Sequence, residues 1–385
     1  MTKSLTKLWL GGLKRLVAAQ TKPLRTTKKR ADRPARPVPK PSVKVRRPAR
    51  DTVGVAPRES RVRPRATAWA AGSWIRSFHS APPAPGRLVN QMSYALYTPA
   101  VSVGNDVPLV VMLHGCQQDA DQFAEGTRMN LLADRYGFAV VYPEQSKHVH
   151  AHRCWHWYDA SDHAGGSEAR AVASLVEALV DKHGFDRERV FLAGISAGAG
   201  LATLLAVRYP EQFAAVALHS GPAFGEAHSG ITAMDVMRRG VRQPPVLLVD
   251  RDVDVDEYPG MPAVIVTGDV DHVVSPVNSE QLTEQFLRLN GLIDASGARR
   301  SGEAREERKA GVVTRDYLRS GRRVVRSVRV QGLGHAWAGG DETVPFHSAK
   351  GPDASALIWE FFRYQRRSVE EGAARRPRGA AASAA

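Results

Sequence analysis

Uninterrupted apolar runs alternate along this chain with longer runs whose apolar residues recur at helical spacing. Short uninterrupted apolar runs are typical of strands buried on both faces of a parallel sheet. They fall at 108–114, 138–142, 189–195, 214–218 and 263–266. The helix-like runs fall at 119–136, 167–183, 199–207, 277–289 and 354–366. This alternation with short connections predicts one doubly wound α/β domain, whose mostly parallel sheet carries helices on both faces.

The remaining segments of the domain have weaker patterns. Residues 74–78 and 92–99 are predicted to be antiparallel edge strands, and 312–318 and 323–331 to be two further strands. Residues 222–260 show no clear period. Residues 291–311 are rich in Gly, Arg and Glu, which predicts a surface insertion.

Four segments are expected along the chain. Residues 72–367 form the α/β domain. They follow a basic amphipathic segment at 1–20 and a disordered Pro/Arg/Lys-rich linker at 21–71. Residues 368–385 form an Ala/Arg-rich tail that is also expected to be disordered.

The positive charge of the chain is concentrated at its N-terminal end. The 385 residues carry a formal charge of +15, but residues 1–65 hold 20 Lys and Arg against 3 Asp and Glu, a net +17. The rest of the chain is therefore nearly neutral, at −2. Because the basic segment after residue 20 lacks aromatic side chains for base stacking, no specific nucleic-acid partner is predicted.

The first 20 residues allow two interpretations. Leucines and Trp9 recur at helical spacing among lysines, which is typical of a short helix that binds an anionic surface or a granule. The alternative is a marginal helix or an atypical targeting segment. Lys14 and Arg15 interrupt the apolar stretch, so a secretory signal is not predicted, and no apolar run is long enough to form a transmembrane segment.

The candidate chemistry centres on Gly194-Ile195-Ser196-Ala197-Gly198, between an apolar strand and an Ala-rich helix. Gly-x-Ser-x-Gly in this setting is typical of a nucleophile elbow, in which the serine occupies a strained turn. The small glycines allow close approach of the neighbouring strand and helix. This predicts Ser196 as a catalytic nucleophile of an α/β-hydrolase fold.

A serine nucleophile needs a histidine base and a carboxylate that orients it, in the chain order Ser, Asp, His for this fold. Asp271 follows the strand 263–266, and His335 lies in a Gly-rich loop after the strand 323–331. We therefore predict Asp271 as the acid and His335 as the base. Asp269 is expected to bind turn amides, His272 to lie on the surface, and the competitor His219 to pack and form hydrogen bonds beneath the site.

The oxyanion formed by attack on an ester needs two preplaced donors. One is predicted to be the amide of Ala197. The loop at His114-Gly115-Cys116-Gln117-Gln118 supplies the other, with the amide of Cys116 preferred and that of Gln117 as alternate. No metal or cofactor is predicted.

Several motifs together resemble the poly(3-hydroxybutyrate) depolymerase family of esterases, which is related to feruloyl and acetylxylan esterases. They are Leu113–Gln118, Gly126–Asn130, Tyr142–Gln145, Arg153–Trp157, Gly194–Gly198, Gly268–Asp271 and Gly332–Trp337. The resemblance implies the same roles for Ser196, Asp271, His335 and Cys116, and hydrolysis of short-chain hydroxyacyl esters, often outside the cell. A cytoplasmic, granule-associated protein is the alternative that the absence of a clear signal suggests.

The resemblance leaves several points open. Trp157 and Trp337 either line a groove for the acyl chain or polyester or pack beneath the loops, and Trp155 is expected to pack. Cys116 and Cys154 are either a disulfide or two buried thiols. The alternative functions are a carbohydrate-ester hydrolase, such as a feruloyl or acetylxylan esterase, and a non-catalytic protein that binds granules or surfaces.

Overall fold

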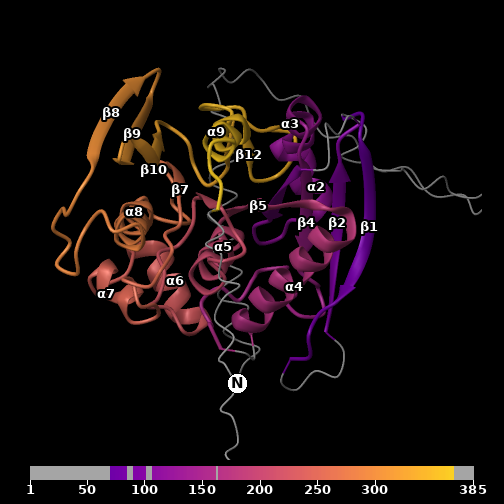
Figure 1. The fold of residues 1–385 in the computed structure, drawn as a ribbon, viewed down its shortest axis with the longest axis horizontal. Coiled ribbons are helices and arrows are strands. Elements are labelled where there is room, and N and C mark those ends of the chain that lie inside the picture. The colour runs from indigo at the N-terminus through magenta and orange to yellow at the C-terminus, as the bar shows by residue number, and fades with distance from the viewer. Residues whose placement is uncertain (1–69, 85–89, 101–105, 162–163, 368–385) are drawn as a thin grey trace, which may run out of the picture. The chain divides into compact units, whose positions relative to one another are not determined.

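Ten strands form one mixed sheet in the computed structural model, which describes residues 70–84, 90–100, 106–161 and 164–367 (Figure 1). In spatial order the strands are β1 (Ser73–Ser80), β2 (Gln91–Thr98), β4 (Ala139–Glu144), β3 (Val107–Leu113), β5 (Phe185–Ile195), β6 (Ala215–His219), β7 (Ala263–Gly268), β10 (Arg322–Val330), β9 (Val312–Arg319) and β8 (Glu303–Lys309). The strands from β4 to β10 run parallel, and two antiparallel strands flank them on each side. The predicted α/β-hydrolase sheet is confirmed. The predicted segments 1–20 and 368–385, and all but residues 70 and 71 of 21–71, lie outside the described residues.

Helices cover both faces of this sheet (Figure 1). One face packs on α4 (Gly165–His183), α5 (Ala197–Arg208), α6 (Gly230–Arg239), α7 (Pro245–Asp250) and α8 (Val277–Leu289). The opposite face packs on α2 (Ala120–Thr127), α3 (Met129–Tyr136) and α9 (Ala354–Phe362). Successive residues of a strand point to opposite faces, so Leu109 and Val111 enter the first core and Val110 and Met112 enter the second. This double burial explains the uninterrupted apolar runs of the central strands.

Two predicted helices have different limits in the structure. The run at 119–136 is two helices, because Arg128 adopts a left-handed conformation (φ 56°) and its amide closes α2 on the carbonyl of Ala124 at 3.1 Å. The run at 354–366 ends at Phe362. The first break comes two residues after Gly126, and the second involves neither proline nor glycine. The spacing of apolar residues marked neither boundary.

Three other expectations need correction. Residues 222–260 contain α6 and α7, and β2 is an internal strand between β1 and β4. The predicted surface insertion 291–311 contains β8, whose sequence Glu-Ala-Arg-Glu-Glu-Arg-Lys is exposed at every position. Hydrogen bonds to β9 hold this strand, and charged side chains protect its free edge, so it shows no apolar alternation.

After β10, the short strands β11 (Trp337–Ala338) and β12 (His347–Ser348) pair in parallel and form a second, two-stranded sheet. No helix within the described ranges combines the length and apolarity required to cross a membrane.

Candidate active site

Ser196 occupies the sharp turn between β5 and α5. Its backbone has φ 56° and ψ −122°, a sparsely populated conformation for a residue with a side chain. The neighbouring glycines are required by contact, because a Cβ atom on Gly198 would lie 2.1 Å from the carbonyl oxygen of Leu113, and one on Gly194 would lie 2.5 Å from Gly198. The elbow therefore holds the Ser196 hydroxyl at the N-terminus of α5, where the helix dipole favours negative charge.

Asp271 and His335 form a buried pair. His335 Nδ1 lies 2.8 Å from Asp271 Oδ2, while Asp271 Oδ1 accepts the amides of Val273 and Val274 at 2.9 Å each. Burial raises the pKa of Asp271, but His335 and these amides outweigh it, so this pKa lies below its ordinary value. The carboxylate is therefore ionised at neutral pH, and the Nδ1–H of His335 donates to it.

The other residues considered for these roles lie elsewhere. Asp269 is exposed and its Oδ1 accepts the Gly332 amide at 2.7 Å, which ties the Asp271 turn to the His335 loop. His272 is exposed.

Ser196, Asp271 and His335 all follow the carboxyl ends of parallel strands, namely β5, β7 and β10. Among the described contacts no hydrogen bond joins Ser196 to His335; such bonds often tighten only when a substrate is bound.

His219 connects these two parts of the site. The sequence predicted that His219 packs and forms hydrogen bonds beneath the site, but not that it makes this link. Its carbonyl accepts the amide of Ser196 at 3.0 Å, and its Nε2 accepts the amide of Ala338, beyond His335, at 3.1 Å. The ring is fully buried and stacks on Trp337 with 5.1 Å between centroids. Burial, with the nearby charge of His335, lowers the pKa of His219 to about 3, so the ring stays neutral and Nε2 remains an acceptor.

His219→Ala is expected to lower kcat for p-nitrophenyl butyrate by about tenfold with little change in KM, because the loop that carries His335 loses one hydrogen bond and one stacked ring. His219→Gln keeps an acceptor and should recover part of that loss. Steady-state kinetics and thermal unfolding of both variants check this. If kcat falls equally in His219→Ala and His219→Gln, or if only KM changes, His219 does not position the loop that carries His335.

The loop after β3 is held by several contacts. The Gly115 amide donates to Gln118 Oε1 at 2.8 Å, and Trp155 Nε1 donates to the His114 carbonyl at 3.0 Å. Cys116 forms a disulfide with Cys154, which decides between the two states that the sequence left open. The Gln117 amide already donates to the His152 carbonyl at 2.7 Å, so Gln117 is a poor second donor for an oxyanion.

The two candidate oxyanion amides are those of Cys116 and Ala197. No acceptor for the Cys116 amide is found in the part of the chain that the structure describes. Ala197 is the first residue of α5, where an amide has no partner inside the helix. Both amides can therefore serve a ligand.

The three tryptophans near the site have different surroundings. Trp337 is fully buried: its Nε1 donates to Ser355 Oγ at 3.1 Å, and its ring packs against Phe123 and His219. Trp337 therefore supports the site from the core and lines no open groove. Trp155 is also fully buried, whereas Trp157 lines a cavity and packs against Gly200 in α5. Its predicted contact with substrate remains a prediction.

The buried histidines predict a loss of stability in acid. Burial lowers the pKa of His347 to about 4 and also lowers that of His114, as it does for His219. The unfolded chain binds these protons near pH 6.5, so stability should fall as the pH drops from about 6.5 toward 4, by about 1.4 kcal/mol per pH unit for each such group.

Urea unfolding at pH 7.5, 6 and 5 checks this prediction. His347→Gln should show a shallower fall than the native chain, and His272→Gln, at an exposed position, should not. A midpoint independent of pH over this range would contradict the prediction.

The described residues contain no group of three or more His, Cys, Asp or Glu side chains arranged to hold a metal ion.

The order of the strands in the sheet and the turn at Ser196 define an α/β-hydrolase. A solved structure supports this fold. The acetyl xylan esterase from Aspergillus awamori matches 74% of this chain and 99% of its own, with a TM-score of 0.56 and 20% identity. The model of the family described as esterase, PHB depolymerase, matches residues 92–310, more than half of the chain. The chain belongs to this esterase family, which confirms the resemblance seen in the motifs.

Curated relatives share this region. The poly(3-hydroxyalkanoate) depolymerase C of Paucimonas lemoignei is 32% identical over 193 residues, 49% of this chain and 46% of that protein. The feruloyl esterase B of Thermothelomyces thermophilus is 38% identical over 120 residues, 31% of this chain and 40% of that protein. A probable acetylxylan esterase A of Neosartorya fischeri is 28% identical over 193 residues, 48% and 52% of the two chains. The chain thus spans about half the length of these relatives or less.

Proposed function

We propose that this protein is a serine esterase that cleaves short-chain acyl esters through Ser196, His335 and Asp271. The observation that carries the proposal is the buried 2.8 Å pair of His335 and Asp271, on the same sheet edge as the strained Ser196. Membership in an esterase family supports the reaction class.

The geometry supports the following proton transfers within this proposal. Because Nδ1 of His335 is bound to Asp271, Nε2 is the atom that accepts the Ser196 proton as Oγ attacks the ester carbonyl. The amides of Cys116 and Ala197 stabilise the oxyanion. His335 then protonates the departing alcohol, and water releases the acid from the acyl-enzyme by the same sequence of transfers.

Two substrate classes agree with this chemistry. The family description and the depolymerase relative favour hydroxyalkanoate esters, polymeric or oligomeric. The feruloyl and acetylxylan esterase relatives favour esters of carbohydrates. Docking of the basic N-terminal segment on granules or anionic surfaces, and the compartment, stay predictions.

Covalent labelling tests the proposed nucleophile. Treatment with diethyl p-nitrophenyl phosphate should release one p-nitrophenolate per chain and leave the diethylphosphoryl group on the peptide that contains Ser196. Activity on p-nitrophenyl butyrate should disappear in proportion to labelling. If the chain hydrolyses p-nitrophenyl butyrate but is labelled at a residue other than Ser196, or is not labelled, the proposal is refuted.

A further inference from the structure

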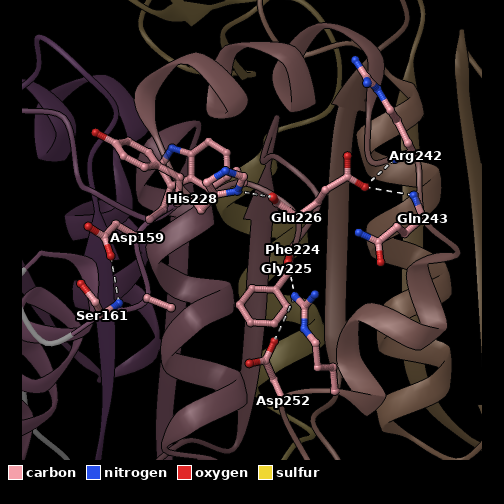
Figure 2. A pocket seen from close by; sticks show the side chains of 14 residues that line it. Asp159, Ser161, Phe224, Gly225, Glu226, His228, Arg242, Gln243 and Asp252 are labelled. Carbon is pink, nitrogen blue, oxygen red and sulfur yellow. Dashed lines mark hydrogen bonds and ion pairs between the residues drawn. The ribbon is translucent and has the colours of Figure 1, made fainter.

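A cavity of about 670 Å³, with both aromatic and charged side chains in its walls, lies among the loops after β4 and β6 and the segments beside α6 and α7 (Figure 2). This volume is typical of small-molecule sites, which span about 300–1,000 Å³. Figure 2 shows Asp159 and Ser161 on one side, Arg242 and Gln243 on the other, and Phe224 and Glu226 between them. The cavity is therefore built from segments that are distant in sequence.

The cavity is connected to the elbow through Trp157. This side chain lines the cavity and packs so closely on α5 that a Cβ atom on Gly200 would lie 2.6 Å from its ring. The Gly200 amide donates to the Ser196 carbonyl at 3.0 Å, in the first turn of α5. Gly200, the residue that Trp157 contacts, thus lies one helical turn, about 5.4 Å along the axis, from the residue that carries the nucleophile.

Hydrogen bonds hold the acidic side chains of the cavity in place. Glu226 Oε2 accepts the amides of Arg242 and Gln243 at 2.7 and 3.0 Å, and Asp159 Oδ1 accepts the amide of Ser161 at 3.0 Å. The second oxygens of these two carboxylates take no hydrogen bond from the described residues. The cavity therefore offers fixed acceptors to the donor groups of a ligand.

The charges in the cavity argue against an anionic ligand. Three carboxylates line it, those of Asp159, Glu226 and Asp252, against two guanidinium groups. Arg242 is paired with Asp235, and Arg251 donates to the Gly225 carbonyl. A phosphate or carboxylate would meet more negative than positive charge.

An aliphatic polyester also fits this cavity poorly. A 3-hydroxyalkanoate chain offers CH groups and carbonyl acceptors but no donors along its length. It would remove Asp159 and Glu226 from water without replacing the lost hydrogen bonds, which is costly for a charged group. Sugar hydroxyls donate to carboxylates and accept from Arg251 or Gln243, and sugar CH groups pack on rings such as those of Trp157 and Phe224.

We propose that this cavity binds a saccharide, the alcohol portion of the ester that Ser196 attacks. The proposal rests on the proposed esterase function and names its leaving group. Asp159 and Glu226 select the saccharide through its hydroxyl groups, and Trp157 joins its site to the elbow.

Binding to the full-length Ser196→Ala chain tests the proposal without turnover. Calorimetric titration with xylotriose should show saturable binding, and the linear trimer of (R)-3-hydroxybutyrate should bind more weakly. Adding Asp159→Ala should weaken xylotriose binding at least about tenfold. Glu257→Ala, an exposed carboxylate outside the cavity, is the matched control and should leave binding unchanged. If Asp159→Ala unfolds the chain, Glu226→Gln replaces it.

The outcomes separate the two proposals. Absent xylotriose binding, tighter binding of the hydroxybutyrate trimer, or equal binding by the Asp159→Ala and Glu257→Ala chains would overturn the saccharide site. Turnover of p-nitrophenyl butyrate by the native chain needs no saccharide. If the native chain does not turn over p-nitrophenyl butyrate but xylotriose binds saturably, the esterase function and the role of the saccharide as its leaving group are refuted. The cavity then remains a saccharide-binding site.

Discussion

Ser196→Ala is expected to lower kcat for p-nitrophenyl butyrate by about 10⁵- to 10⁶-fold, because the acyl-enzyme can no longer form. The residual rate comes from the oxyanion amides and from substrate binding. Alanine keeps the Cβ atom and the same backbone, and the hydroxyl of Ser196 makes no hydrogen bond within the described residues, so the thermal unfolding midpoint should change little.

Rates on p-nitrophenyl butyrate and thermal unfolding, measured on the same preparation, check this result. Ser279→Ala, a buried serine on α8, is the matched control and should retain activity. Substantial activity in Ser196→Ala would exclude Ser196 as the nucleophile. An equal loss in Ser279→Ala would indicate that the assay reports folding and not chemistry.

Asp271→Asn is expected to lower kcat by about 10⁴-fold, the scale observed when a triad carboxylate becomes an amide. Asparagine can still accept the amides of Val273 and Val274, so the turn should persist. Its amide group, however, favours the wrong tautomer of His335, with the proton on Nε2, and cannot stabilise the imidazolium.

Asp269→Asn is the matched control in the same turn. An asparagine oxygen can still accept the Gly332 amide, so kcat should change less than about threefold, since only a neutral hydrogen bond replaces a charged one. The two variants are compared by kcat over pH 5–9. A larger loss in Asp269→Asn would reverse the assignment of the acid.

The elbow and the order of the site residues could be predicted because their signals are local. Gly194 and Gly198 are required by contacts within the turn and with the adjoining β3 strand. Asp271 and His335 follow strand ends, and parallel strands bring their carboxyl ends to one edge. The sequence also favoured Asp271 over Asp269, and the structure places only Asp271 against His335.

Other elements could not be predicted from the sequence because the segments that stabilise them are distant in the chain. β8 is exposed on both faces, so only its pairing with β9 reveals it as a strand. The break at Arg128 depends on the left-handed backbone conformation of a residue other than glycine. A tryptophan two residues after His335 has the same sequence signal whether it faces a groove or the core, and the packing of Trp337 on Phe123 and His219 decided for the core.

The sequence by itself determined the α/β class and the candidate nucleophile, acid and base, because periodicity and turn chemistry act over a few residues. Its motifs, taken together, also indicated the esterase family by resemblance. Only the tertiary structure decided three things: the link that His219 makes between Ser196 and the His335 loop, the Cys116–Cys154 disulfide, and the cavity that joins Asp159 to Glu226. Each depends on residues from segments that are distant in the sequence and that the packing of strands and helices brings together. Such contacts produce no periodic pattern in the sequence.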